Sequence, residues 1–142
     1  MKKLEKVEWI ISTQNDVSDG GWEMLSRSRS LREFRVKIGE GCKLLDEGLR
    51  SLSKISNSIS LDCLRIEVNN ENETSESGWS NLLSSINLEK MKDFNISVGA
   101  FNECSQKSLG YLAVVFERSS PRIEYLTLDF KESNNINSDS IL

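Results

Sequence analysis

Residues 61–68 read LDCLRIEV, and this stretch decides the fold because its spacing of apolar residues recurs along the whole chain. Leu61 is followed by apolar residues three, five and seven positions later, at Leu64, Ile66 and Val68. The same spacing begins near residues 4, 31, 91 and 123. Apolar and polar residues alternate within each copy, which is the period of a β-strand with one buried face. The sequence therefore predicts five short strands at a nearly constant interval.

A short helix is predicted after each of the first four strands. These segments begin with glycine and carry apolar residues three and four positions apart, as one helix face requires, at residues 21–25, 48–52, 78–83 and 110–115. Gly110 stands two positions later in its repeat than the other glycines, which we interpret as a two-residue insertion. A glycine within a helix costs about 1 kcal/mol relative to alanine, so its recurrence predicts a close approach of helix to strand. Trp9, Trp22 and Trp79 are predicted to pack in or against the core.

A strand and a helix cannot bury their apolar faces alone, but stacked units share one continuous core. In this pattern the whole chain resembles the leucine-rich-repeat family, above all its long-repeat, ribonuclease-inhibitor-like class. The resemblance implies an α/β solenoid, with a curved parallel sheet of about five strands on the concave side and helices on the convex side. It also implies one domain, residues 1–142, with an incomplete last repeat. The run into Asn134-Asn135-Ile136, rich in Asn, Ser and Ile, is similar to such repeats in ciliate proteins.

The chain departs from the family at the turn after each strand. The family has asparagine or cysteine eight positions after the strand start, where this chain has Ser12, Gly39, Asn69, Gly99 and Lys131. Only Asn69 fits. We therefore predict irregular turns that mostly lack the ladder of side-chain amides that satisfies backbone groups there.

Composition argues against catalysis. The chain has a formal net charge of -4 and no histidine, so it lacks the usual general base and the commonest metal ligand. Cys42, Cys63 and Cys104 are odd in number and lack C-x-x-C spacing, which predicts free thiols. The acidic stretch 69–76, NNENETSE, lacks EF-hand spacing and is predicted to be a solvated loop. We predict no catalytic residue, cofactor or metal, and a protein that is not an enzyme.

The same features bound the partners and the location. An acidic chain, with a pI of about 5.0, is not expected to bind nucleic acid. It has no apolar stretch long enough to span a bilayer and no recognisable leader at its N-terminus, so an intracellular, cytoplasmic protein is expected.

The strand residues that point away from the core are expected to form three rows across the sheet. The first row is Lys6, Glu33, Cys63, Asp93 and Tyr125; the second is Glu8, Arg35, Arg65, Asn95 and Thr127; the third is Ile10, Lys37, Glu67, Ser97 and Asp129. Neighbours in a row should lie about 5 Å apart. Ion pairs are therefore expected for Lys6 with Glu33, Glu8 with Arg35, and Lys37 with Glu67. Cys63 is expected to be the most exposed thiol.

Two interpretations of these rows remain open. One is an ordinary solvated face, whose ion pairs each contribute at most about 1 kcal/mol. The other is a protein-binding concave face, because arginine and tyrosine are common interface anchors. Its candidate residues are Arg35, Lys37, Arg65, Glu67, Asp93, Asn95, Tyr125 and Asp129.

The predicted function is a non-catalytic interaction module or scaffold that binds another protein through this face or through its exposed ends. Neither end of the chain resembles the polar cap that a solenoid needs. The chain is then either a subunit whose ends are covered by neighbouring subunits or a fragment of a longer repeat protein. The alternative function is a permanent accessory subunit of a large complex, ciliary or cytoskeletal if the ciliate resemblance holds.

Overall fold

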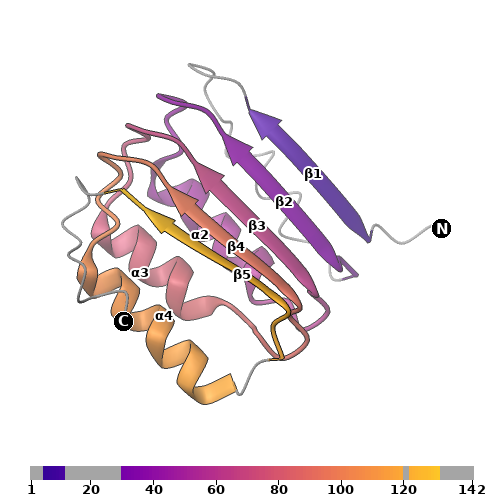
Figure 1. The fold of residues 1–142 in the computed structure, drawn as a ribbon. Helices are drawn as coiled ribbons and strands as arrows, with labels where there is room; N and C mark the ends of the chain where they lie inside the picture. Colours follow the sequence, from indigo (N-terminus) through magenta and orange to yellow (C-terminus); the bar gives the residue numbers. More distant parts are fainter. Residues whose placement is uncertain (1–4, 12–29, 120–121, 132–142) are drawn as a thin grey trace.

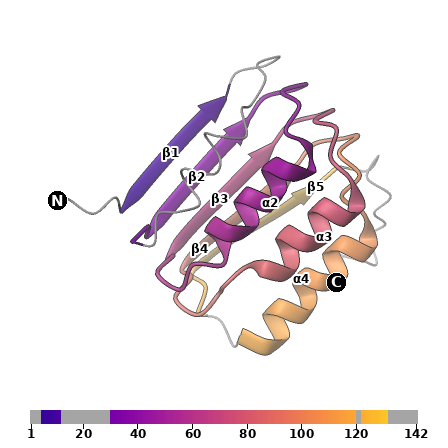
Figure 2. The same cartoon turned by 180° about the vertical axis from the view of Figure 1, so that it is seen from behind.

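A computed structural model of the protein describes residues 5–11, 30–119 and 122–131. Its five strands form one parallel sheet in sequence order (Figure 1), with the bounds β1 (Lys6–Ile11), β2 (Glu33–Ile38), β3 (Cys63–Val68), β4 (Asp93–Val98) and β5 (Tyr125–Phe130). Helices α2 (Leu45–Ser56), α3 (Glu76–Ser85) and α4 (Gln106–Ser119) cover one side of the sheet (Figure 2). The chain is thus an α/β protein with a five-stranded parallel sheet. The five predicted strands and three of the predicted helices are confirmed, whereas the helix predicted at 21–25, with Trp22, lies outside the described residues.

The strands pair in the register that the repeat predicts. Lys6 pairs with Glu33, which pairs in turn with Cys63, and the same alignment continues through Asp93 to Tyr125. A shift of one residue would turn every apolar side chain of a strand away from the core, so the alternating pattern fixes this register. All three predicted rows are therefore confirmed as rows of neighbouring residues.

One hydrophobic core lies between the sheet and the helices. Phe34, Leu64 and Phe94 occupy one row of core-facing strand positions and are fully buried. Trp79 is also fully buried, and Trp9 packs against the edge of the core, as predicted. Leu126 continues the row of Phe94 on β5 but is 51% exposed. The core is therefore densest under β2 to β4 and thins at β5.

The prediction that the turns lack an amide ladder is wrong for the three turns that the structure describes, because the ladder stands three positions further along in these repeats. The Asn72 Oδ1 accepts from the backbone N–H of Cys42 at 3.0 Å, and the Asn102 Oδ1 accepts from that of Asn72 at 2.9 Å. The Asn72 Nδ2 donates to the carbonyl oxygens of Gly39 and Asn69, both at 3.0 Å. Each amide thus ties its own turn to the turn before it.

The turns are also regular, contrary to expectation. The residues on either side of each ladder position have positive φ angles: Gly41 and Lys43, Glu71 and Glu73, Phe101 and Glu103. The same alternation buries Asn72 and Thr74 while their neighbours Glu71 and Glu73 stay exposed. Residues 69–76 are therefore a structured turn, and the prediction of a solvated loop is wrong for its buried half.

The close approach of helix to strand that the recurring glycines predict is not found at Gly78 or Gly110, and Gly21 lies outside the described residues. A Cβ on Gly78 would lie 2.3 Å from the Asp46 Oδ1 and 2.9 Å from the Leu49 Cδ1, so the close neighbour is α2. A Cβ on Gly110 would have no atom within 4 Å outside the adjoining backbone of its own helix. The prediction of a helix–strand contact is therefore wrong at Gly78 and Gly110.

Ser108, and not Gly110, takes the place of Gly78 in the next repeat. The Ser108 N–H donates to the Ser105 Oγ at 3.4 Å, as that of Gly78 donates to the Ser75 Oγ at 3.3 Å. The Ser108 hydroxyl also donates to the carbonyl oxygen of Glu76 on α3, at 3.2 Å. The helix therefore starts in phase, and the predicted insertion before it is wrong. The extra length lies further on, since α4 has 14 residues and α3 has 10.

Alanine at two of the glycines is expected to act in opposite directions. A Cβ on Gly99 would lie 2.7 Å from the backbone nitrogen of Asn70, so Gly99→Ala must displace backbone. We expect it to lower the free energy of unfolding by about 1–3 kcal/mol. Gly110→Ala meets empty space within α4 and should raise it by about 0.5–1 kcal/mol. Urea denaturation of both variants measures the difference, and changes of the same sign would contradict this account.

Candidate protein-binding face

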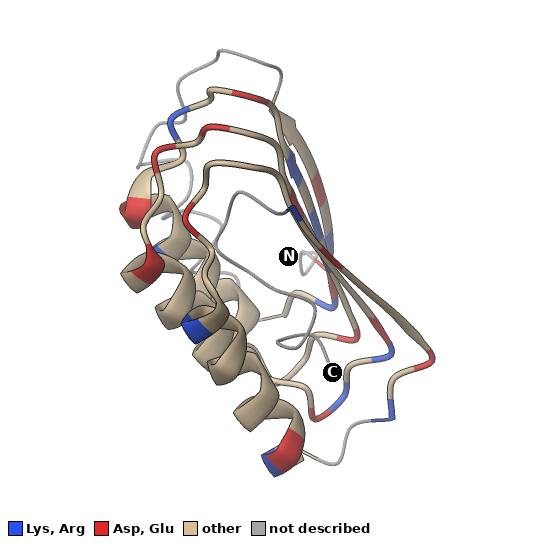
Figure 3. Ribbon diagram, turned by 60° about the vertical axis from the view of Figure 1, so that its left-hand side comes forward, with Lys and Arg blue, Asp and Glu red and all other residues tan. Residues whose placement is uncertain are grey.

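The side of the sheet opposite α2, α3 and α4 carries the three predicted rows, and we call these rows the open face. Figure 3 shows the sheet and the helices as two layers, with basic and acidic positions scattered over the strands and turns. Because the rows follow the confirmed register, long side chains from neighbouring strands come within reach of one another. The open face is thus a continuous, mostly polar surface built by short, evenly spaced strands, with Ile10 and Tyr125 exposed at its two sides.

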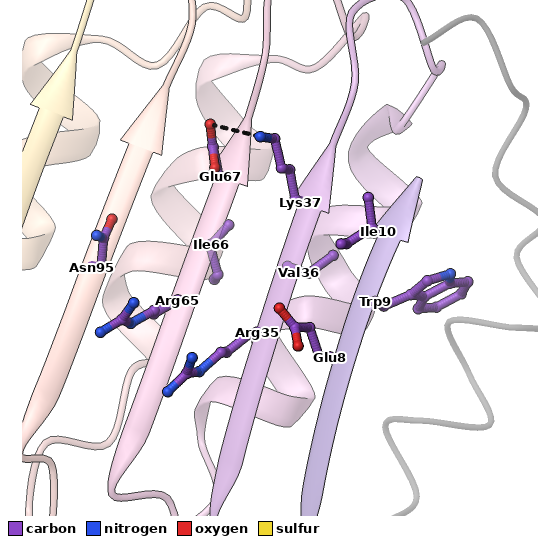
Figure 4. Close-up of a pocket in the computed structure, with 10 residues that line it drawn as sticks. All are labelled: Glu8, Trp9, Ile10, Arg35, Val36, Lys37, Arg65, Ile66, Glu67 and Asn95. Atoms are coloured by element: carbon purple, nitrogen blue, oxygen red, sulfur yellow. Dashed lines mark ion pairs between the residues drawn. The ribbon is translucent and has the colours of Figure 1, made fainter. Parts of the chain in front are cut away.

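Two of the three predicted ion pairs form on the open face. The Lys6 Nζ lies 3.4 Å from the Glu33 Oε2, and the Lys37 Nζ lies 3.9 Å from the Glu67 Oε1. Glu8 and Arg35 are paired in register, as predicted. In Figure 4 the Arg35 side chain extends away from Glu8 and toward β3, and no dashed line joins the two.

The strongest pair on the open face was not predicted. The Arg65 Nη2 donates to the Asp93 Oδ2 at 2.5 Å, and its Nε donates to the Asp93 Oδ1 at 3.3 Å. This two-point contact crosses from the second row to the first, and its hydrogen bonds raise the pKa of Arg65. Because the sequence rows align only directly opposite residues, they gave no signal for a diagonal pair.

Cys63 is the most exposed of the three thiols, as predicted, but it is still buried on the open face, and Cys42 and Cys104 are fully buried. Only 5% of its surface is exposed. Burial raises the pKa of the Cys63 thiol, while a hydrogen bond from Arg35 acts in the opposite direction. The charges of Glu33 and Asp93 also act on it from both neighbouring strands. The longer side chains around it therefore cover this small residue. All three cysteines are buried thiols.

The buried thiol of Cys104 is expected to make the fold less stable at alkaline pH. Burial raises its pKa from 9.0 to about 12. Between these values the unfolded chain binds fewer protons than the folded one, so the free energy of unfolding falls as pH rises. Its contribution is complete below pH 9.0 and is lost as the pH approaches about 12, with a limiting slope of about 1.4 kcal/mol per pH unit.

Urea denaturation of the wild type and of Cys104→Ala, at several pH values above neutrality, isolates this contribution. The variant should lose stability less steeply because it has no thiol to ionise at that position. Identical slopes for the two proteins would contradict the assignment to Cys104.

The structure gathers most of the candidate residues around one shallow hollow of about 210 Å³ (Figure 4). Its candidate residues are Arg35, Lys37, Arg65, Glu67 and Asn95. The hollow also includes Glu8 and Ile10, which the sequence placed in the rows but not in the predicted site. Their position beside β2 in the confirmed register was the available signal.

The other candidate residues lie toward or at β5. Asp93 joins the group through its contact with Arg65. Tyr125 is 68% exposed, and the carboxylate of Asp129 lies 3.4 Å from the Lys131 Nζ. Two strands separate Tyr125 and Asp129 from Arg35, so the eight candidate residues do not form one compact site.

The described residues show neither a metal-binding cluster nor a membrane-spanning helix. In the described ranges, no group of three or more His, Cys, Asp or Glu side chains is placed to hold a metal ion. The helices described here lack the combination of length and hydropathy that a bilayer crossing requires.

No protein-family model matches the chain, and no curated protein is significantly similar to it.

Proposed function

We propose that the chain is a leucine-rich-repeat solenoid of the ribonuclease-inhibitor-like class. The support is the strand–helix unit that recurs along the chain, the parallel strands in sequence order, and the ladder through Asn72 and Asn102. Each of these features is expected when successive units bury one shared core. The concave side of such a solenoid would be the open face.

We further propose that the protein binds another protein through the open face, without catalysis. The observation that carries this proposal is the hollow at Arg35 and Arg65, two arginines paired with each other in register. Like charges directly opposite each other destabilise a sheet, so stability alone does not account for this arrangement. Arginine is also enriched among the residues that contribute most to binding. An intracellular, cytoplasmic location remains a prediction from the sequence.

Charge reversal tests this function. The variant Arg35→Glu/Arg65→Glu should lose the partner that the wild-type protein captures from its source cells, because both arginines lie at the hollow. The matched control is Arg50→Glu/Lys54→Glu, which makes the same charge change at exposed positions of α2. Circular dichroism checks that both variants fold. Capture of the same proteins by both variants and the wild type would exclude binding through the open face.

A second candidate function is a permanent accessory subunit of a large complex, ciliary or cytoskeletal in kind. It is favoured by apolar side chains exposed on the last helix and strand described, namely Tyr111, Val114 and Leu126. A neighbouring subunit could bury this surface. A permanent subunit should co-purify at fixed stoichiometry through a high-salt wash, whereas an adaptor should exchange its partners.

A further inference from the structure

Arg35 is the basic residue of the open face whose charge the chain balances least. Its Nη2 lies 4.0 Å from the Glu33 Oε2, and that same oxygen lies closer to Lys6, at 3.4 Å. Arg65, by contrast, has both oxygens of Asp93 to itself within the described part of the face. Arg35 therefore shares a distant carboxylate, while its neighbour makes a close two-point contact.

The local structure also leaves part of the Arg35 guanidinium unsatisfied. Its Nε is buried and has no hydrogen-bond partner, and the side chain as a whole is 34% exposed. A guanidinium has five N–H donors in one plane, which suits a carboxylate well. The Arg35 side chain is therefore partly open to solvent, and because its Nε is covered, an outside carboxylate would have to meet its terminal Nη groups.

Of the basic residues that line the hollow, Arg35 has the most distant carboxylate. Three basic residues and two acidic residues line the hollow: Arg35, Lys37, Arg65, Glu8 and Glu67. Lys37 and Glu67 pair with each other, and Figure 4 shows the Arg35 guanidinium directed away from Glu8 toward β3. A carboxylate placed over β2 and β3 would therefore meet Arg35 without first displacing Glu8.

The hollow has an apolar rim on the β1 side. Ile10 lines it and is 64% exposed. Ile10 lies on β1 in the third row, whereas Arg35 lies on the neighbouring strand β2 in the second row. At strand spacings of about 4.8 Å across and 6.6 Å along, adjacent side chains of one peptide can reach both residues.

We propose that the partner protein presents an aspartate or glutamate carboxylate to Arg35 and an aliphatic side chain to Ile10. This inference rests on the proposed open-face function and adds the chemistry of the partner. A carboxylate is the expected ligand because its charge is complementary to that of Arg35. It would give Arg35 the close partner that Asp93 gives Arg65.

The test uses a phage-displayed library of random peptides selected on the wild-type protein. Selected peptides should be enriched in Asp or Glu next to Leu, Ile or Val. Fluorescence anisotropy should show at least ten-fold weaker binding to Arg35→Gln and unchanged binding to the matched control Lys54→Gln. Changing the acidic residue of the peptide to its amide should weaken binding to the wild type equally, with little further loss on Arg35→Gln. Such non-additivity is the mark of a direct contact.

Backbone amide shifts in NMR spectra separate the failure of this inference from that of the proposed function. Peptides that shift β2 and β3 signals but lack acidic residues, or that bind Arg35→Gln as tightly as the wild type, would overturn the inference and leave open-face binding intact. Peptides that shift only helix signals would overturn both. A selection that yields no binder would also overturn the inference, while the capture experiment would still decide the function.

Discussion

Asn72→Ala is expected to lower the free energy of unfolding by about 3–5 kcal/mol, because the variant leaves several buried backbone groups without partners. The Asn72 side chain is fully buried and bonds the N–H of Cys42 and the carbonyl oxygens of Gly39 and Asn69. Alanine supplies none of these bonds, and the N–H of Cys42 and the carbonyl oxygen of Gly39 lie in buried surroundings. The measurement is urea denaturation followed by circular dichroism.

Asn95→Ala is the matched control, because Asn95 is a partly exposed asparagine on the open face. Away from buried networks such a change is expected to stay within about 0.5 kcal/mol. A loss at Asn72 no larger than that at Asn95 would show that the ladder does not hold the turns together.

Trp79→Ala is expected to cost a similar amount, about 3–5 kcal/mol, mainly through the cavity it creates. The Trp79 side chain is fully buried in the core. Its indole Nε1 donates to the Thr74 Oγ1 at 2.9 Å and to the carbonyl oxygen of Asn102 at 2.8 Å. The residue therefore fills space and also joins α3 to the turn after β4.

Trp79→Phe separates these two roles. Phenylalanine keeps much of the volume, and Thr74 still donates to the Asn102 carbonyl at 2.6 Å, so we expect a loss of about 1–2 kcal/mol. Urea denaturation of both variants gives the comparison. Equal losses for Trp79→Ala and Trp79→Phe would mean that the hydrogen bonds, not the packing, account for the effect.

The strands and their register could be predicted because one physical rule governs both. Each strand has one buried face, so alternation such as that of Leu64, Ile66 and Val68 identifies the strand and fixes its alignment. The rows of the open face follow from the same rule. Helices α2, α3 and α4 could be located from apolar spacing. The prediction places the start of α4 too late, because it treats Gly110, in place of Ser108, as the equivalent of Gly78.

The turns were mispredicted because the family position was applied at a fixed distance from the strand. Cys42, Asn72 and Asn102 follow one another at the same interval as Leu31, Leu61 and Met91. That signal was present in the sequence. The recurrence of asparagine or cysteine at this interval, and not its distance from the strand, marks the ladder.

The candidate site could be predicted only as rows of residues. Which long side chains meet is decided by rotamers, and the sequence does not fix these. Arg65 reaches diagonally to Asp93, and Arg35 turns toward β3 and helps to cover Cys63. The burial of Cys63 and the shape of the hollow follow from those orientations.

The amide ladder makes each repeat depend on the one that follows it. Asn72 completes the turn that contains Cys42, and Asn102 completes the turn that contains Asn72. Loss of a later repeat therefore leaves a backbone N–H of the earlier turn without its acceptor in the ladder. Loss of an earlier repeat does not remove the ladder acceptor from a backbone N–H of the later turn. The cooperativity of the array therefore has a direction, because each turn depends on the repeat that follows it. Partial unfolding that begins at the β5 side should spread inward more readily than unfolding that begins at β1, and amide protons should exchange in that order.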